Sequence, residues 1–366
     1  MNIFKDAHYL FFISLNYRIA TMHIRASNHV YNTNIQGLRA IAIFLVLGCH
    51  FNIPLMKGGY IGVDIFFVIS GYLITRLIFT NIENHTFSII NFYARRLKRL
   101  LPTLILVITV SILFSFLLLS PEESISRSKS FPYALTWTSN LYFAFHKIGY
   151  FNELATQDIF LHTWSLGVEE QFYLIWPAIF LALSAKSNIF YKHRLGFISV
   201  LLTISIFSFI LNIYLMGNNN KLAFYIPLTR IWEFSAGGLI FFIKSDISRK
   251  TYFQHLFKPI IILCLGFIFF SSAFYQESLT YPGYWASIPV ISSALLILIF
   301  HLKKEIFNFF SNKLMCWVGD RSYSIYLWHW PILIVYNSLQ LKFPPLTNII
   351  ILLSISLIIS DFSYRY

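Results

Sequence analysis

Long apolar runs separated by short polar stretches dominate the hydrophobic pattern of the chain. A helix needs about 20 largely apolar residues to cross a bilayer. Such runs predict membrane-spanning helices at 38–56, 60–80, 101–119, 166–183, 195–216, 223–243, 258–275, 284–302, 315–338 and 346–362. The aromatic stretch 131–151 is interrupted by polar residues and is expected to belong to a long loop. The pattern therefore predicts an all-α integral membrane protein, a bundle of about ten transmembrane helices.

The composition supports a multi-pass protein over a soluble enzyme with one membrane anchor. Hydrophobic residues make up 57% of the chain and charged residues 12%. Soluble domains carry about 25% charged residues, because their whole surface faces water. So few charges suit a surface that faces lipid.

Basic residues indicate the orientation, because Lys and Arg are retained on cytoplasmic loops. One set of alternate loops is clearly richer and comprises Arg95, Arg96, Lys98, Arg99, Lys186, Lys192, Arg194, Lys244, Arg249, Lys250, Lys303, Lys304 and Lys313. The other loops hold Lys57, Arg127, Lys129, Lys147, Lys221 and Lys342. We therefore predict that both termini are cytoplasmic. The same rule explains the formal net charge of +13 without a nucleic-acid partner.

Residues 1–33 do not fit this pattern. The apolar stretch 9–19 is too short to span a membrane and lacks the small-residue cleavage site of a signal peptide. Met22 is an alternative start. We therefore expect an N-terminal extension at 1–33 and a transmembrane domain at 34–366.

Ionisable groups within spans are costly and mark functional sites. Arg39 and His50 stand eleven positions apart in the first span. Eleven residues at about 100° each end roughly 20° past three turns, so the two share one helix face about 16 Å apart along the axis. His50 is the predicted catalytic residue, with a structural histidine as the alternative.

Acidic residues in the apolar runs are the next candidates. Asp64 lies at the outer edge of the second span and could pair with a histidine or an arginine. An acidic neighbour orients an imidazole as a base. Glu169, Glu170 and Gln171 begin another span and are expensive unless they face a polar cavity.

Further candidates are basic or paired. Arg96 and Arg99 lie in a cytoplasmic cluster, where guanidinium groups match phosphate oxygens bidentately; anchoring of the helix end is an equal alternative. Arg230 and Glu233 stand three apart and can pair on one helix face. His329 is a second intramembrane histidine, with structural and functional roles equally weighted. Three cysteines, an odd number without metal-ligand spacing, give no reason to expect a metal site.

Five motifs in this order resemble the acyltransferase-3 family of bacterial membrane O-acyltransferases. They are the spacing of Arg39 and His50, the block at 62–71 with Asp64 and Ser70, the pair Arg96 and Arg99, the block at 162–173 that begins with His162, and the block at 323–331 with Tyr326 and His329. Together they cover the chain from about residue 33 to its end. Motif matches are hypotheses, but five in order are a specific signal.

The resemblance implies a bacterial inner-membrane enzyme that transfers an acyl group, usually acetyl from acetyl-CoA, to a hydroxyl of a surface polysaccharide such as lipopolysaccharide O-antigen, or to a lipid-linked glycan. It also implies that His50 is essential and that Arg39, Arg96 and Arg99 handle the acyl-CoA. Asp64 and Glu169 complete the predicted catalytic set. His50 is either a general base or a transient acyl carrier, and the sequence does not separate the two.

Related proteins with this terminal pattern often continue into an SGNH-type esterase-like domain. The sequence stops after the last predicted span, so we expect that domain to be absent and an extracytoplasmic partner to be a candidate acceptor. Two other classes remain as alternatives. A flippase for a lipid-linked sugar would use the buried ionisable groups as a permeation path without cleaving a thioester, and a structural subunit would tolerate loss of Arg39 and His50.

Overall fold

The computed structural model describes residues 31–146, 156–185, 194–243, 251–276, 279–303 and 308–365. The chain divides into two units, Met1–Thr33 and Asn34–Tyr366, and the second contains the candidate site. The predicted N-terminal extension lies almost wholly outside the described residues. So do several basic residues used for the orientation, namely Lys147, Lys186, Lys192, Lys244, Arg249, Lys250 and Lys304.

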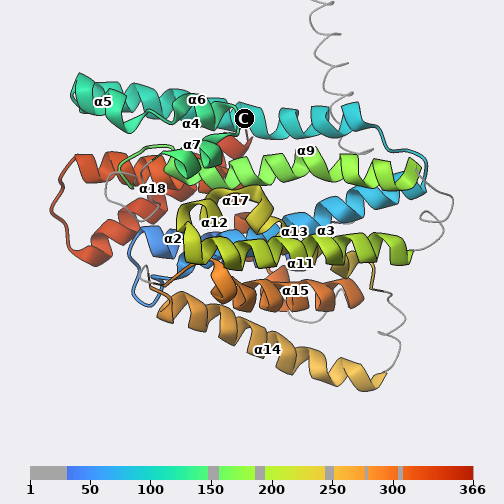
Figure 1. Ribbon diagram of the computed structural model, residues 1–366. Coiled ribbons are helices and arrows are strands. Elements are labelled where there is room, and N and C mark those ends of the chain that lie inside the picture. Colours follow the sequence, from blue (N-terminus) through green and yellow to red (C-terminus); the bar gives the residue numbers. More distant parts are fainter. Residues whose placement is uncertain are drawn as a thin grey trace, which may run out of the picture. The chain divides into compact units, whose positions relative to one another are not determined.

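Every element within the described ranges is a helix (Figure 1). The ten longest are α2 (Thr33–His50), α3 (Gly62–Glu83), α4 (Ile89–Leu118), α9 (Trp164–Ala185), α11 (Arg194–Asn218), α13 (Pro227–Phe241), α14 (Thr251–Phe274), α15 (Ser287–Leu302), α17 (Lys313–Ser338) and α18 (Pro345–Arg365). The short ones are η1 (Gly59–Ile61), α5 (Pro121–Arg127), α6 (Phe131–Leu135), α7 (Ser139–Phe145), η2 (Leu161–Thr163), α12 (Asn220–Tyr225), η4 (Gly283–Ala286) and α16 (Asn308–Ser311).

Each predicted span falls on one of the ten long helices, which confirms the all-α membrane fold. Eight of the helices are long and apolar enough to cross a bilayer. The other two are α13, which has 15 residues, and α17, which is rich in Tyr, Trp and Ser and is therefore less apolar. Pro227 separates α12 from α13, because proline is favoured at a helix start and disrupts a helix interior. The full count of ten spans and the positions of the termini stay predictions.

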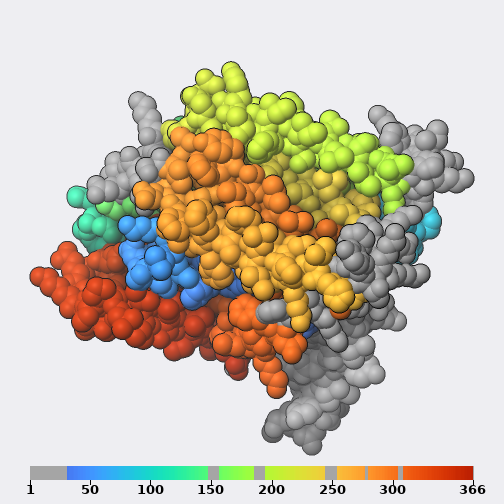
Figure 2. Space-filling model, turned by 90° about the horizontal axis from the view of Figure 1, so that it is seen from below, coloured from blue at the N-terminus to red at the C-terminus, as the bar shows by residue number. Residues whose placement is uncertain are grey.

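The helices divide into an inner and an outer group. Over an apolar stretch of 18 residues, 78% of the residues are buried in the η1–α3 segment but only 17% in α11. The exposed side chains of α11, α14 and α18 are mostly large and apolar, for example Phe207, Phe267 and Ile358. Figure 2 shows one face of the molecule, where α11 and α14 lie at the surface. These faces suit contact with lipid, while α2, α3, α9, α13 and α17 surround the polar residues.

Glycines allow α3 and α13 to pack with their backbones almost in contact. A Cβ added at Gly71 would lie 1.9 Å from the carbonyl oxygen of Phe234, and one at Gly237 would lie 1.9 Å from that of Val68. Small residues permit such close approach between membrane helices. The contact is central to the site, because α3 and α13 supply its buried ion pair.

Replacing Gly71 with alanine is expected to lower the stability of the protein by about 1–3 kcal/mol, because the new methyl group must push two backbones apart. Heating the protein in detergent and monitoring the folded fraction by size-exclusion chromatography measures the change in stability. Gly266→Ala is the matched control, since an added Cβ there meets nothing within 4 Å. Equal losses in the two variants would contradict the tight-packing explanation.

Candidate active site

A pair of histidines lies where α2 ends against α17. Nδ1 of His50 is 2.9 Å from Nε2 of His329, and the two rings are stacked with 10° between their planes. Nδ1 of His329 is 2.6 Å from the carbonyl oxygen of Tyr326. The two histidines are 279 positions apart in the sequence, so only the packing of α2 against α17 brings them together.

The hydrogen bonds of this pair assign its tautomers. A carbonyl oxygen only accepts, so Nδ1 of His329 carries a proton and its Nε2 is the acceptor when the ring is neutral. His50 therefore donates from Nδ1, and its lone pair lies on Nε2. This is how a second group orients a general base or nucleophile. The orienting partner of His50 is thus another histidine, where an acidic residue was one expectation.

Three aromatic and hydroxyl residues surround the pair. Trp330 contacts the His50 ring edge-on at a centroid distance of 4.7 Å. Tyr326 donates to the carbonyl oxygen of His162 at 2.8 Å and accepts from Ser165 at 2.6 Å. The centre of the His162 ring lies 5.5 Å from the centre of the His329 ring. The backbone of Leu327, on α17, also interacts with the His162 ring. η2, the start of α9 and α17 therefore meet at the histidine pair.

A buried ion cluster joins α3 to α13. Nη2 of Arg230 lies 2.9 Å from Oδ1 of Asp64, and its Nε lies 3.2 Å from Oε1 of Glu233. Tyr281 donates to Oδ2 of Asp64 at 2.5 Å. The predicted contact between Arg230 and Glu233 is therefore present. Of the two partners predicted for Asp64, the structure has the arginine.

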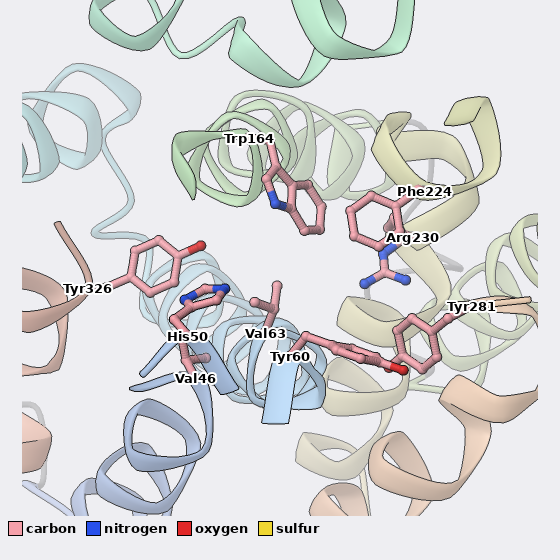
Figure 3. Close-up of a pocket in the computed structure, with 9 residues that line it drawn as sticks. All are labelled: Val46, His50, Tyr60, Val63, Trp164, Phe224, Arg230, Tyr281 and Tyr326. Atoms are coloured by element: carbon pink, nitrogen blue, oxygen red, sulfur yellow. The ribbon is translucent and has the colours of Figure 1, made fainter. Parts of the chain in front are cut away.

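One small cavity, of ≈ 10 Å³, connects the histidine pair with the ion cluster (Figure 3). Its lining residues are Val46, His50, Tyr60, Val63, Trp164, Phe224, Arg230, Tyr281 and Tyr326. Figure 3 shows His50 and Arg230 on opposite sides, with Val63 and the rings of Trp164 and Tyr60 between them and Val46 beside His50. The imidazole and the guanidinium therefore face one space that is otherwise mostly apolar.

Glu169 and Glu170 lie further along α9, away from the cavity. Ser70 and Tyr173 both donate to Oε1 of Glu169. Arg96 forms an ion pair with Glu170 at 3.3 Å, and its guanidinium lies 3.3 Å from the centre of the Tyr173 ring. The predicted catalytic residue Glu169 therefore sits in a second polar cluster, next to one of the predicted coenzyme-binding arginines.

Arg39 and Arg99 belong to the surroundings of this second cluster. Arg39 donates to Gln36 at 3.3 Å, and its charge interacts with those of Arg99 and Glu169. We call Arg39, Arg96 and Arg99 the arginine end of the site. Tyr323 of α17 donates to the carbonyl oxygen of Leu100, directly after Arg99, so α17 reaches this end as well as the histidine pair.

Gln171 belongs neither to this second cluster nor to the cavity. Its side chain donates to the carbonyl oxygen of Trp137 at 3.0 Å and to Asn140 at 2.8 Å. Asn140 in turn donates to the carbonyl oxygen of Tyr225 at 3.2 Å. Gln171 therefore anchors α9 to α7 and α12, and it does not line the cavity.

Three residues around the site, Tyr281, Ser165 and Trp330, are not marked individually by the sequence pattern. Tyr281 lies between helices in a stretch with no periodic pattern. Ser165 and Trp330 lie within the quoted motifs, and that position was the only signal available for them. Within the described ranges no three His, Cys, Asp or Glu side chains are grouped as they would be around a metal ion. That the reaction needs no metal stays a prediction.

His50 is a half-buried histidine whose tautomer is fixed by a second histidine, and a row of arginines lies toward the other end of the same helices. A histidine oriented in this way inside a membrane bundle suits an enzyme that transfers a group. The chain belongs to the acyltransferase-domain family, which matches residues 32–365. This confirms the family resemblance that the motifs indicated.

Two curated relatives extend the comparison. The peptidoglycan O-acetyltransferase OatA of Listeria monocytogenes is 32% identical over 353 residues, which cover 92% of this chain and 55% of the relative. The O-acetyltransferase OatA of Staphylococcus aureus is 32% identical over 352 residues, covering 92% of this chain and 56% of the relative. The chain thus spans about half the length of these relatives. No solved structure matches it.

Asp158 precedes η2 and connects Ser130, the residue before α6, to Trp330 of the site. Its carboxylate accepts from Ser130 at 2.5 Å and from the backbone N–H of Phe160 at 2.8 Å, and its carbonyl oxygen accepts from Trp330 at 2.9 Å. Burial raises the pKa of the Asp158 carboxyl group from 3.8 to about 6, although both hydrogen bonds to the carboxylate oppose this shift.

The raised pKa predicts a pH dependence. The folded state holds the proton more tightly than the unfolded state, so this group's contribution to stability is complete below pH 3.8 and is lost as the pH rises through about 6. The difference is on the order of 3 kcal/mol. Asp158→Asn keeps an acceptor for both hydrogen bonds without titrating. Between pH 4 and 6.5, the midpoint of thermal unfolding should fall more in the wild type than in this variant, and parallel curves would contradict the assignment.

Proposed function

We propose that this chain is an O-acyltransferase of a bacterial cytoplasmic membrane. It takes an acyl group, acetyl first of all, from acetyl-CoA on the cytoplasmic side and passes it to a hydroxyl of a cell-envelope polysaccharide. The observation that carries the proposal is a set of three polar rows that run from the arginine end to the histidine pair. Each row lies on a different inner helix.

The rows follow helical periodicity. On α2, Arg39 and His50 share one face, about 16 Å apart along the axis. On α9, Ser165, Glu169 and Tyr173 recur every four residues and therefore lie on one side of the helix. On α17, Tyr323, Tyr326 and His329 recur every three residues. Ser165 bonds to Tyr326, and the His50 ring bonds to His329, so the three rows meet at the histidine end.

The arginine end suits coenzyme A, which carries several phosphate charges. Arg95, Lys98 and Arg99 are exposed on one turn of α4, close to Arg96. Arg96 is held by Glu170 and by the ring of Tyr173. Guanidinium groups bind phosphate oxygens in bidentate fashion. The phosphates would remain at this end while the narrow thioester arm follows the polar rows toward His50.

The lone pair on Nε2 of His50 supports two routes. As a general base, His50 takes the proton of the acceptor hydroxyl while that oxygen bonds to the thioester carbon; the carbon–sulfur bond breaks, and the proton passes to the leaving sulfur. As a nucleophile, Nε2 bonds to the thioester carbon, the carbon–sulfur bond breaks, and the Nδ1 proton of His50 passes to the leaving sulfur. The acceptor hydroxyl then bonds to the acyl carbon, the carbon–nitrogen bond breaks, and the hydroxyl proton returns to the imidazole. Both routes need the tautomer that His329 imposes, so the geometry supports them equally.

For the acceptor we put peptidoglycan ahead of O-antigen, because the Listeria relative is named a peptidoglycan O-acetyltransferase. The relatives are almost twice as long as the matched region, so an extracytoplasmic SGNH-type domain remains the alternative first acceptor. In either case a hydroxyl group receives the acyl group on the outer side.

The purified protein in detergent should release free thiol from acetyl-CoA in the presence of a soluble peptidoglycan fragment. His50→Ala should reduce the rate at least about 100-fold, because the base or nucleophile is lost. A thiol-reactive dye follows the release, and mass spectrometry detects acetyl ester on the fragment.

His85→Ala is the control for this test, since His85 is an exposed histidine after α3 and lies outside the site. Equal rates in the wild type and in His50→Ala would refute the role of His50. If acetyl-CoA does not bind and no thiol is released, the flippase alternative takes precedence.

The role of the arginine end predicts a separation of kinetic effects. Arg99→Gln should raise KM for acetyl-CoA about tenfold, equivalent to roughly 1.4 kcal/mol of binding, with kcat nearly unchanged. The effect should shrink at high salt, because exposed charges are screened. Lys221→Gln removes a positive charge from α12 and serves as the control. If that variant raises KM equally, the effect reflects net charge rather than a binding site.

A further inference from the structure

Arg230 lies deep in the wall of the cavity, and the proposed chemistry of His50 does not use it. Its side chain is 1% exposed. Nη2 bonds to Asp64, and Nε lies 3.2 Å from Glu233. Nη1 is buried and makes no hydrogen bond to any residue that the structure describes. A buried donor without an acceptor is costly, so an acceptor that enters the cavity would complete this group.

The position of Arg230 relative to His50 suggests what that acceptor is. Arg230 and His50 both line the cavity of ≈ 10 Å³, and Figure 3 shows them facing it from opposite sides. In acyl transfer, a base or nucleophile approaches the carbonyl carbon while a hydrogen-bond donor takes the carbonyl oxygen. These are the two functions that the cavity offers.

We propose that this cavity is the acyl pocket, that Arg230 binds the acyl carbonyl oxygen, and that the surrounding walls restrict the acyl chain to acetyl. The inference rests on the proposed function and adds its catalytic donor and its donor specificity. When the carbonyl carbon is attacked, the carbonyl π electrons move to the oxygen. Arg230 stabilises that negative charge without giving up a proton, whichever route His50 follows.

Three groups hold the guanidinium in place. Asp64 and Glu233 contact it from α3 and α13, and Tyr281 fixes the second carboxylate oxygen of Asp64. The rings of Phe67, Trp164 and Phe224 lie 5.6–5.9 Å from its central carbon. A donor fixed in advance in an apolar environment stabilises developing charge at little reorganisation cost. This explains why two carboxylates and a tyrosine are used around one arginine.

The walls explain the restriction to a short chain. Val46, Val63 and the rings of Tyr60, Trp164 and Phe224 all line the cavity. A space of this size holds about one water-sized group. A methyl group fits it, whereas each further methylene has to displace a packed side chain, which close-packed interiors resist.

The first test enlarges the pocket. Val63→Ala removes two methyl groups from the wall, so the ratio of kcat/KM for propionyl-CoA to that for acetyl-CoA should rise about tenfold. Val68→Ala is the matched control, because Val68 is a buried valine on the same helix that is not among the lining residues. Thiol release by the purified protein, with the peptidoglycan fragment as acceptor, gives both ratios.

An unchanged ratio in Val63→Ala, or an equal rise in Val68→Ala, would overturn the acyl-pocket assignment while leaving the proposed function intact. Absence of release from either thioester by the wild type would contradict the proposed function itself and remove the basis for the pocket.

The second test addresses the oxygen contact. Arg230→Lys keeps the positive charge between the two carboxylates but loses the unpaired guanidinium N–H donor. We expect kcat to fall about 100-fold, with KM for acetyl-CoA changed less than about threefold. Arg321→Lys is the control, since Arg321 pairs with Asp361 between α17 and α18, away from the cavity. Normal kcat in Arg230→Lys would overturn the role of Arg230, and a variant that fails to fold leaves the Val63 comparison to decide the pocket.

Discussion

The ion pair between Asp64 and Arg230 is the interaction on which the site depends. Both side chains are almost completely buried among apolar helices, where an unpaired charge would be very expensive. The pair can form only because glycines let α3 and α13 approach closely. In turn it fixes a guanidinium at one side of a cavity whose other side is His50. The close packing of α3 against α13 therefore makes the ion pair possible, and the ion pair places the guanidinium that the proposed chemistry uses.

Residues next to the histidine pair connect α17 to the stretch 158–163, which precedes α9. Trp330, which contacts His50, also donates to the backbone of Asp158, and Tyr326 donates to the backbone of His162. The stretch before α9 is therefore bonded directly to the residues around His50.

In the proposed function, the arginine end and the cavity next to His50 bind different parts of acetyl-CoA. The arginine end has exposed positive charges and suits the phosphates of the coenzyme. The cavity is small, mostly apolar and suited to the acyl group. Separating the two lets binding energy from the remote part of the coenzyme position the reacting carbon. A flippase would have no need of so small a cavity beside a histidine with a fixed tautomer.

The sequence determined the features that depend on local periodicity and composition. Apolar runs located the ten long helices, an eleven-residue spacing put Arg39 and His50 on one face, and a three-residue spacing predicted the contact of Arg230 with Glu233. The motifs also identified the family, because they preserve residue types in order.

The tertiary structure decided which distant residues meet. Asp64 had two candidate partners in the sequence, and helix packing selected Arg230, 166 positions away. His50 met His329 rather than a carboxylate, and Tyr281 joined the ion cluster from a stretch without periodic pattern. A helical pattern specifies which face of a helix is polar, but it does not specify which other helix that face meets. That choice follows from the packing of the whole bundle.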